Sequence, residues 1–436
     1  MTSPATAIST PVTSPVVPVH HNNNSIPALK ICLLGYRSAP YSGGQGIYLK
    51  YLSKALLEAG HEVDVISGQP YPELDPGVRL IKMPGMNLYE TGLGSLRWGH
   101  LRSWTNIVEW TGKLTGAFSE PYCFGRRVYK YLRHHGRRYD IVHDNQCLSY
   151  GILALQKAGI PLVTTVHHPI SSDLSIALAA AKDSTERMLI RRWHSFIDMQ
   201  REVAAKLHHI VTVSERSRQD IAAAFDIQPS AIHLVHCGID TDVFRPIPEI
   251  VKKPYRIMAT VSADQPLKGL KYLLEAMAEL LPHYPELTLL LVGKPKADGE
   301  SQRLINELGI GGHIQCVSGI STEQLVHYYN EAEVVVVPSV YEGFGLPAGE
   351  AMACGTAVVS SEGGALPEVV GDAAERVPIK DSKAIAAAVA DLLNDAPKRQ
   401  AFEAAGRRRI ENNFSWQRAA QEMAVLYTKV IDSENR

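Results

Sequence analysis

Two glutamates, Glu342 and Glu350, stand eight positions apart in the segment PSVYEGFGLPAGE, residues 338–350. The segment follows the apolar run 334–337, which predicts a buried strand that leads through a glycine-rich turn into a helix. Such a turn places Glu342 and the amides that follow it at the carboxyl end of the strand. Ionised carboxylates accept hydrogen bonds from paired hydroxyls, so this pair suits two diols, one on a sugar and one on a ribose. A purely electrostatic role at a helix N-terminus is the alternative that the two residues alone leave open.

A second glycine-rich turn, PYSGGQG at residues 40–46, follows the first expected strand and precedes an amphipathic helix. Backbone N–H groups in such a turn approach a ligand closely, and a helix N-terminus adds partial positive charge that favours phosphate. The turn is neither a G-x-G-x-x-G fingerprint nor a Walker loop, because its spacing differs and no Lys-Ser or Lys-Thr follows. An ordinary strand-to-helix turn is therefore an equal alternative.

The elements that must position these turns alternate between short β-branched runs and helical segments from Lys30 onward, which is typical of parallel sheets covered by helices on both faces. In the first series we expect strands at 30–34, 62–66, 140–143, 162–166 and 209–213, and helices at 46–59, 148–158 and 214–225. In the second series we expect strands at 256–261, 287–292, 314–317 and 334–337, and helices at 269–281, 300–308 and 322–331. Between residues 84 and 138 the regular pattern fails.

Length and composition allow two domains. The 436 residues exceed what one core usually organises, and the fractions of 45% hydrophobic and 20% charged residues are ordinary for a globular protein. Three prolines in the segment 244–254 separate the two series and predict a linker. We expect four parts, which are a disordered tail at 1–28, an N-terminal acceptor-binding domain at 29–245, a C-terminal donor-binding domain at 246–413 and a terminal helix at 414–436. Two such domains form a cleft at the carboxyl ends of their strands, where these sheets bind ligands.

Charge and cysteine usage exclude several classes of protein. A formal net charge of −1 argues against a nucleic-acid partner. The 6 cysteines show neither zinc nor disulfide spacing, which indicates a reducing, cytoplasmic environment. No run approaches the roughly 18 apolar residues of a transmembrane helix, and residues 1–28 lack the pattern of a secretory signal.

The segment EGFGLPAGEAMACGT at residues 342–356 resembles the E-x7-E signature of family 4 of the retaining glycosyltransferases, which adopt the GT-B fold. The likeness covers nearly the whole chain after residue 29. Residues 40–46 resemble the family's first glycine loop, residues 165–167 its cleft histidine, residues 238–244 the segment before the linker, and Lys268 its donor-phosphate lysine. The resemblance therefore implies an α/β protein with two Rossmann-like domains that face each other across a cleft, and a C-terminal helix that crosses back to the first domain.

The resemblance also implies a role for each matching residue. The expected donor-binding residues are Glu350 at the ribose, Glu342 with the amides of Gly343, Phe344 and Gly345 at the sugar, Lys268 with amides near Gly44 and Gly46 at the diphosphate, and the backbone of Gly319 and Ile320 at the base. His167, Lys268 and Glu342 are the expected catalytic residues. Retention in this family is usually described without a covalent enzyme intermediate, so Glu342 is expected to bind sugar and not to form half of a hydrolase pair.

Two features bear on the charges near the diphosphate. Family members commonly carry an arginine five positions before the lysine, and this sequence has Ala263 there, so the second cation is missing or supplied elsewhere. Asp240 and Asp242 form a D-x-D pattern, but it lies in the turn before the linker, and we expect no metal there. Neutralisation by Lys268 and backbone amides implies that the enzyme needs no metal or other cofactor.

The expected function is retaining hexosyl transfer from a nucleoside diphosphate sugar to a hydroxyl acceptor on a glycan, lipid or small molecule. A sugar-nucleotide epimerase of the same fold and a non-catalytic sugar-nucleotide binder are the alternatives. The irregular part of the first domain, around 85–125, is expected to bind the acceptor. Within it, residues 96–110 mix Trp with Arg, which suits either peripheral contact with the inner face of a membrane or a helical lid over an acceptor pocket. The sequence does not identify the base, the sugar, the acceptor or the oligomeric state.

Overall fold

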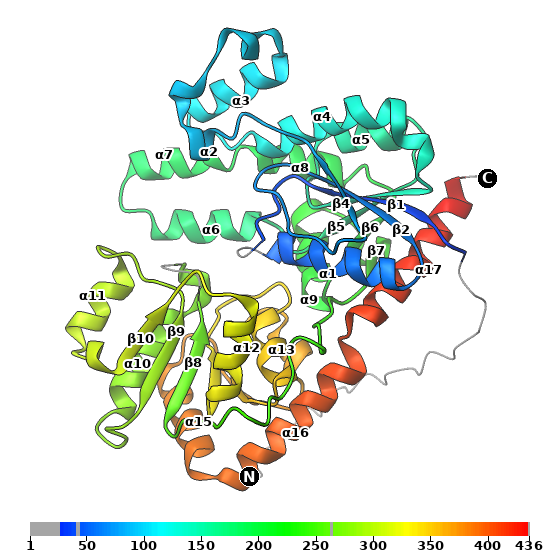
Figure 1. Cartoon of the computed structure of the whole chain (residues 1–436). Coiled ribbons are helices and arrows are strands. Elements are labelled where there is room, and N and C mark those ends of the chain that lie inside the picture. The colour runs from blue at the N-terminus through cyan, green and yellow to red at the C-terminus, as the bar shows by residue number, and fades with distance from the viewer. Residues whose placement is uncertain (1–26, 41–43, 262–264, 435–436) are drawn as a thin grey trace, which may run out of the picture.

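The computed structural model describes residues 27–40, 44–261 and 265–434, and it arranges them as two parallel sheets with helices on both faces (Figure 1). The first sheet has seven strands in the order β3-β2-β1-β4-β5-β6-β7, and the second has six in the order β10-β9-β8-β11-β12-β13. The first sheet consists of β1 (Lys30–Gly35), β2 (Glu62–Ser67), β3 (Arg79–Lys82), β4 (Ile141–Asn145), β5 (Leu162–Val166), β6 (Ile210–Thr212) and β7 (Ile232–Leu234). The second consists of β8 (Arg256–Thr260), β9 (Thr288–Val292), β10 (Ile314–Val317), β11 (Val334–Val337), β12 (Ala357–Ser361) and β13 (Glu375–Val377). The predicted α/β class is therefore confirmed.

Helices cover both faces of the first sheet because its strands are apolar on both sides. Its helices are α1 (Gly44–Glu58), α2 (Leu88–Thr91), α3 (Trp104–Leu114), α4 (Glu120–His135), α5 (Tyr150–Lys157), α6 (Ser171–Ala180), α7 (Ser184–Trp193), α8 (Phe196–Ala204) and α9 (Glu215–Phe225). Side chains of α1 pack on one face with Ile31 and Leu33, whereas α4, α5 and α8 pack on the other with Cys32 and Leu34. Alternate residues of β1 thus serve two cores.

The stretch 84–138, where the sequence pattern fails, contains a succession of helical segments without a strand. They are α2, the 3-10 turns Leu93–Ser95 and Trp98–Arg102, α3, α4 and the 3-10 turn Gly136–Arg138. The alternation of strand and helix fails there because α2, the first two 3-10 turns and α3 are inserted between β3 and α4, and α4 is the helix of this stretch that packs on the sheet (Figure 1).

The second sheet is sandwiched in the same way. Its helices are α10 (Leu270–Leu280), α11 (Glu300–Glu307), α12 (Thr322–Glu331), α13 (Leu346–Ala353), α14 (Leu366–Val370), α15 (Ser382–Asn394) and α16 (Ala396–Asn413). One core joins α10 and α15 to the strands, and the other side of the sheet carries α12, α13 and α16. Within the described part of the chain, no helix has the length and apolar character needed to cross a membrane.

The C-terminal helix α17 (Trp416–Glu434) crosses back to the first domain, as predicted (Figure 1). Its Trp416 ring stacks on Tyr51 of α1, with ring centroids 5.9 Å apart. At the crossing point, Ile239 N donates to the carbonyl of Phe414 over 2.6 Å. A Cβ on Gly238 would lie 2.3 Å from the backbone nitrogen of Trp416, so the two segments can pass this closely only at a glycine.

Four strands were not predicted from the sequence. Three of them, β3, β7 and β13, have three or four residues and lie at sheet edges, where few positions are buried and the apolar pattern is correspondingly weak. The fourth, β12, is fully buried beside β11 but ends in two serines.

Candidate functional site

Several predicted residues follow the strands of the two sheets at their carboxyl ends. His167 follows β5, Lys268 ends the 3-10 turn after β8, and Glu342 follows β11. Because all strand pairs are parallel, these ends share one edge of each sheet, and the two edges face one another across the domain boundary (Figure 1). The topology therefore brings residues far apart in sequence to one region.

Lys268 and Glu342 form an ion pair in which Nζ lies 2.7 Å from Oε1. Glu342 is buried, and the hydroxyl of Ser339 donates to the same oxygen over 2.8 Å. The two turns that carry the pair are in close contact, since Val340 N donates to the carbonyl of Leu267 over 2.8 Å. The pair is thus built from backbone contact between neighbouring turns and presents one cation and one carboxylate together.

Glu350 lies on α13, eight positions after Glu342 in the sequence. Burial raises the pKa of its carboxyl to about 7, partly opposed by a hydrogen bond from the hydroxyl of Tyr329, which lies 3.0 Å from Oε2. Gly345 immediately precedes this helix, and its φ of 109° belongs to the left-handed region that glycine favours. A buried carboxyl of this kind is ready to accept hydrogen bonds from a ligand that compensates its desolvation.

The amides of Gly343, Phe344 and Gly345 belong to the loop between these two glutamates. The Phe344 side chain is buried, with its ring 5.7 Å from that of Phe414, so its side chain serves the core and only its backbone remains for a ligand. The carbonyl of Gly343 accepts hydrogen bonds from Ser214 Oγ over 2.7 Å and Ser217 Oγ over 3.0 Å. The first domain therefore fixes the orientation of a peptide in the second.

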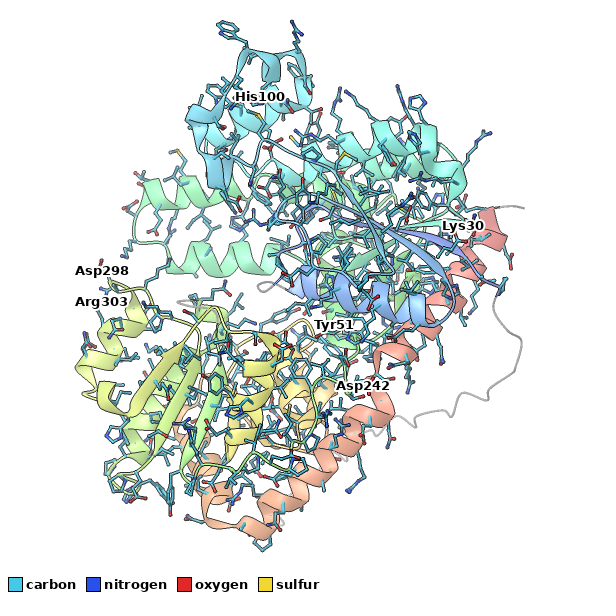
Figure 2. All side chains as sticks on the ribbon, viewed as in Figure 1. Lys30, Tyr51, His100, Asp242, Asp298 and Arg303 are labelled. Carbon is cyan, nitrogen blue, oxygen red and sulfur yellow. The ribbon has the colours of Figure 1, made fainter. Side chains whose placement is uncertain are left out.

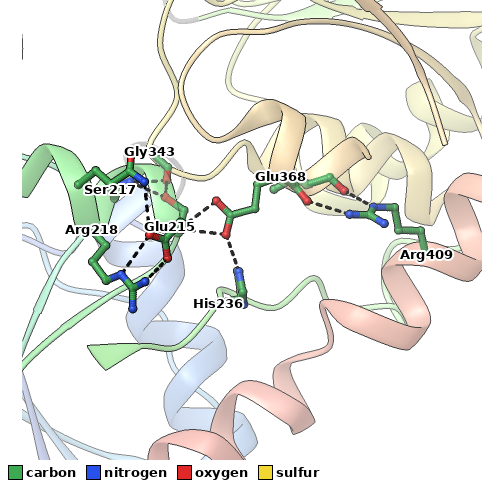
Figure 3. A network of polar contacts seen from close by, with 10 residues as sticks. Glu215, Ser217, Arg218, His236, Gly343, Glu368 and Arg409 are labelled. Carbon is green, nitrogen blue, oxygen red and sulfur yellow. Dashed lines mark hydrogen bonds and ion pairs between the residues drawn. The ribbon is translucent and has the colours of Figure 1, made fainter. Parts of the chain in front are cut away.

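Glu368 reinforces this contact between the domains (Figure 3). Its carboxylate accepts from the amide of Glu215, with both oxygens within 3.0 Å, and lies 2.7 Å from His236 Nε2. Burial opposes ionisation of Glu368, but the hydrogen bonds from His236 and the Glu215 amide outweigh it and lower its pKa. Since Glu215 opens α9, the carboxylate also meets the positive end of that helix.

His167 is held by the two residues that end and follow β4. Its backbone N–H donates to Gln146 Oε1 over 2.8 Å, and its Nε2 lies 2.7 Å from Asn145 Oδ1. Asn145 in turn donates from Nδ2 to the carbonyl of Gln45 over 3.0 Å. Because that carbonyl can only accept, the amide oxygen of Asn145 faces the ring, and His167 carries its proton on Nε2. Burial lowers the pKa of His167 to about 3, so the ring is neutral with Nδ1 as its acceptor.

Replacing Asn145 with aspartate should raise the pKa of His167 by about 1 to 3 units, because a carboxylate in contact favours the imidazolium. An NMR titration of the imidazole, assigned by comparison with His167→Gln, measures this shift. The matched control is Asn306→Asp, which changes an exposed asparagine on α11 and should leave the His167 titration unchanged. An unaltered pKa in Asn145→Asp would contradict the assignment of the contact.

The first glycine loop is described only in part, because residues 41–43 lie outside the described residues. Gly44 opens α1 in open space, whereas a Cβ on Gly46 would lie 2.2 Å from the carbonyl oxygen of Ala39. A glycine is thus required at position 46 for the packing of α1 against the loop. This packing role concerns the Cα and is compatible with a hydrogen bond from the amide of Gly46 to a ligand. Ala263, which stands where an arginine is expected, also lies outside the described residues.

Gly319 and Ile320 follow β10 at the carboxyl edge of the second sheet. Gly319 is exposed, with a φ of 67°. β9 and β8 lie between β10 and β11 in the sheet order, so this turn belongs to the same edge as Glu342 without adjoining it.

The D-x-D pattern is engaged in local structure. Asp240 Oδ1 accepts from the amides of Asp242 and Val243, both over 3.2 Å, and Oδ2 lies 3.4 Å from Lys54 Nζ. Across the described residues, no group of three or more His, Cys, Asp or Glu side chains is arranged to hold a metal ion.

Sequence reasoning missed the side chains that position the predicted ones. Asn145 ends a buried strand and Gln146 follows it, which is a signal that could have identified them. Ser214 and Ser217 show only the pattern of a helix start, since Ser214 Oγ also caps α9 by accepting from the amide of Ser217. Their contact with Gly343 depends on domain arrangement and leaves no trace in the local sequence.

Comparison with known proteins finds relatives that span both sheets. Two family models match, Glycosyltransferase Family 4 over residues 42–243 and Glycosyl transferases group 1 over residues 242–409. The MMP alpha-(1→4)-mannosyltransferase of Mycolicibacterium hassiacum is 43% identical over 411 residues, which cover 92% of this chain and 98% of that protein. Sucrose-phosphate synthase from Thermosynechococcus elongatus superposes with a TM-score of 0.69 at 25% identity, covering 93% of this chain and 100% of the other. Anabaena HepE in complex with UDP-glucose gives a TM-score of 0.66 at 16% identity, with coverages of 92% and 100%.

Proposed function

Because the chain belongs to family 4 of the glycosyltransferases, we propose that it transfers a mannosyl group from a nucleoside diphosphate sugar to a hydroxyl acceptor. Mannose is supported by the mannosyltransferase that shares 43% of its residues over 92% of this chain. A nucleotide sugar as donor is supported by the similarly folded HepE, which binds UDP-glucose. The observation that carries the proposal is the cluster at the carboxyl edge of the second sheet, where Lys268, Glu342 and Glu350 lie on adjoining elements.

Each member of this cluster has a proposed partner on the donor. Glu350 accepts hydrogen bonds from the ribose hydroxyls, which compensate the desolvation that raises its pKa to about 7. Glu342 and the amides of residues 343–345 bind the hydroxyls of the sugar, and the backbone of Gly319 and Ile320 binds the base. Lys268 lies 2.7 Å from Glu342, so a cation that contacts the diphosphate would stand beside the sugar-binding carboxylate.

The leaving group is proposed to depart without a metal ion. The bond from the anomeric carbon to the diphosphate oxygen breaks, the acceptor oxygen bonds to that carbon on the same face, and its proton passes to a phosphate oxygen. Configuration is then retained without a protein nucleophile. Lys268 and amides near Gly44 and Gly46 stabilise the charge that develops on the diphosphate, which is the electrostatic role that Mg²⁺ has elsewhere.

His167 is proposed to bind the sugar from the opposite domain. A Cβ on Gly343 would lie 3.1 Å from the carbonyl oxygen of His167, so this histidine adjoins the sugar-binding loop. Its Nδ1 lone pair and its carbonyl can both accept from a sugar hydroxyl. The acceptor is proposed to approach from the first domain, through the inserted helical segments of 85–125.

A panel of GDP-mannose, UDP-glucose and ADP-glucose, tested for thermal stabilisation in EDTA, examines this proposal. One donor should raise the melting temperature by mass action, and Glu350→Ala should lose the response. The control Glu202→Ala removes an exposed glutamate of α8 and should keep it. Product anomers determined by NMR then test retention. Stabilisation by no donor, or only with Mg²⁺ present, would contradict the proposed donor site.

A further inference from the structure

Exposed apolar side chains concentrate on two segments of the first domain. Eleven large hydrophobic residues are exposed in the described part of the chain, and seven of them lie in the segments 96–118 and 184–194. The seven are Trp98, Leu101, Trp104, Leu114, Met188, Leu189 and Trp193. Trp98 is 88% exposed and Trp104 60% exposed, so neither ring packs against the core as a lid residue would. Apolar groups in this density mark an interaction surface.

The two segments form one lobe, defined here as residues 96–118 and 184–194. Arg192 Nη2 donates to Thr115 Oγ1 over 2.8 Å, and the amide of Phe118 donates to the carbonyl of Trp193 over 3.3 Å. The rings of Phe118 and Trp193 stack with centroids 5.0 Å apart. A shallow apolar pocket of about 370 Å³ lies at this junction and includes Gly116 and Leu189. Figure 2 shows His100 at the outer tip of the lobe, on the side of the first domain away from the second sheet.

The lobe is also positively charged, although the whole chain has a net charge of −1. Five exposed arginines surround the apolar residues, namely Arg97, Arg102, Arg187, Arg191 and Arg192. None of the five forms an ion pair with a carboxylate of the described residues. The carboxylates on α7 are engaged locally, because Asp183 caps the helix and Glu186 accepts from the amide of Lys182. Arg192 donates to Thr115, and the guanidinium groups of the other four arginines are available for an anionic partner.

We propose that this lobe docks the enzyme on a membrane that contains anionic lipids. Tryptophan and arginine are the side chains that favour the membrane interface, where an aromatic ring meets acyl chains and a guanidinium meets phosphate. An anionic leaflet adds attraction for each cation near its surface. A second copy of the chain is disfavoured as the occupant, because a two-fold contact through this lobe would bring the five arginines against their symmetry mates.

The surface continues into the proposed acceptor side of the cleft. α6 starts four residues after His167, and α7 follows α6, so the same connection that leaves the cleft enters the lobe (Figure 1). Docking through α7 therefore holds one wall of the cleft near the lipid surface. The docking surface itself is separate from the donor-binding residues and does not depend on the identity of the donor.

Vesicle flotation tests the proposal with the full chain. The protein should float with phosphatidylcholine vesicles that contain about 30% phosphatidylglycerol, remain unbound with pure phosphatidylcholine, and dissociate as salt is raised. The variants Trp98→Ala/Trp104→Ala and Arg187→Glu/Arg191→Glu should each lower the partition coefficient about tenfold or more. Their melting temperatures should stay unchanged, because these side chains are exposed.

Two control variants test whether a loss of vesicle binding is specific to the side chains of the lobe. Arg408→Glu on α16 and Val251→Ala before β8 change an exposed arginine and an exposed apolar residue outside the lobe, and both should leave binding unchanged. Three results would overturn the proposal. They are no flotation with anionic vesicles, equal loss of binding in lobe variants and controls, and a dimer in light scattering that the lobe variants dissociate while vesicles bind nothing.

Discussion

Replacing Lys268 with alanine should lower kcat/KM for the donor by roughly 10²- to 10³-fold, the range found when one group that stabilises a developing anion is removed. The substitution deletes the cation that lies 2.7 Å from Glu342 at the end of the 3-10 turn after β8. Within the part of the chain that the structure describes, it also leaves the buried Glu342 with the hydroxyl of Ser339 as its side-chain hydrogen-bond partner. Initial rates at varied donor concentration measure the first effect, and the melting temperature measures the second.

A double variant separates these two consequences. Lys268→Ala/Glu342→Gln removes the unpaired carboxylate, so its melting temperature should recover most of the loss while kcat/KM stays low. The control Lys206→Ala deletes an exposed lysine whose partner is Glu202, and it should change neither quantity appreciably. Lys268→Ala with unimpaired kcat/KM would remove the lysine from the proposed charge stabilisation.

Much of the site could be predicted because its residues stand in local motifs. A buried strand that runs into a glycine-rich turn identifies the carboxyl edge of a sheet, and this places Glu342 without knowledge of the rest of the fold. Lys268, in the turn after β8, was identified by the resemblance to the family and not by the strand pattern. The parallel pairing of β8 and β11 then makes their proximity a consequence of topology.

Other parts of the site depend on contacts that no local pattern records. Ser214 and Ser217 begin a helix in the first domain, yet they bind the carbonyl of Gly343 in the second. Asn145 binds both His167, which is 22 positions away in the sequence, and the backbone of Gln45, which is 100 positions away. The close approach of Gly46 to the carbonyl oxygen of Ala39 is likewise a packing contact that the motif at residues 40–46 does not record.

The lobe formed by residues 96–118 and 184–194 is a second feature that the sequence pattern did not define. The Trp and Arg content of residues 96–110 suits either a lid or a surface, and only the exposure of Trp98 and Trp104 distinguishes the two. The contribution of α7 was not foreseen, because no helix was expected over residues 184–193. Its contact with Thr115 places the exposed Met188 and Leu189 beside residues 96–118. Side chains from separate segments define this surface, so composition alone could not delimit it.

Replacing Glu350 with glutamine should make the unliganded protein more stable at pH 8 and abolish its stabilisation by the donor. The folded-state pKa of Glu350 is raised by burial to about 7, from an ordinary value of 4.5. Between these values the unfolded chain ionises while the folded chain keeps its proton, so this carboxyl lowers the free energy of unfolding as pH rises. Above pH 7 the full difference corresponds to about 3 kcal/mol. Glutamine cannot ionise, and its oxygen can still accept from Tyr329, so the variant avoids this cost.

The pH dependence distinguishes this explanation from a general improvement in packing. Melting temperatures of the two proteins should nearly coincide at pH 4 and diverge at pH 8, with the variant higher. Asp144, whose pKa is also raised to about 7 by burial, is present in both proteins and cancels in the comparison. Glu202→Gln, at an exposed position, should show no such divergence. If Glu350→Gln follows the native protein at every pH, the carboxyl is not desolvated as described; if it diverges but still responds to the donor, the desolvated carboxyl does not bind the ribose.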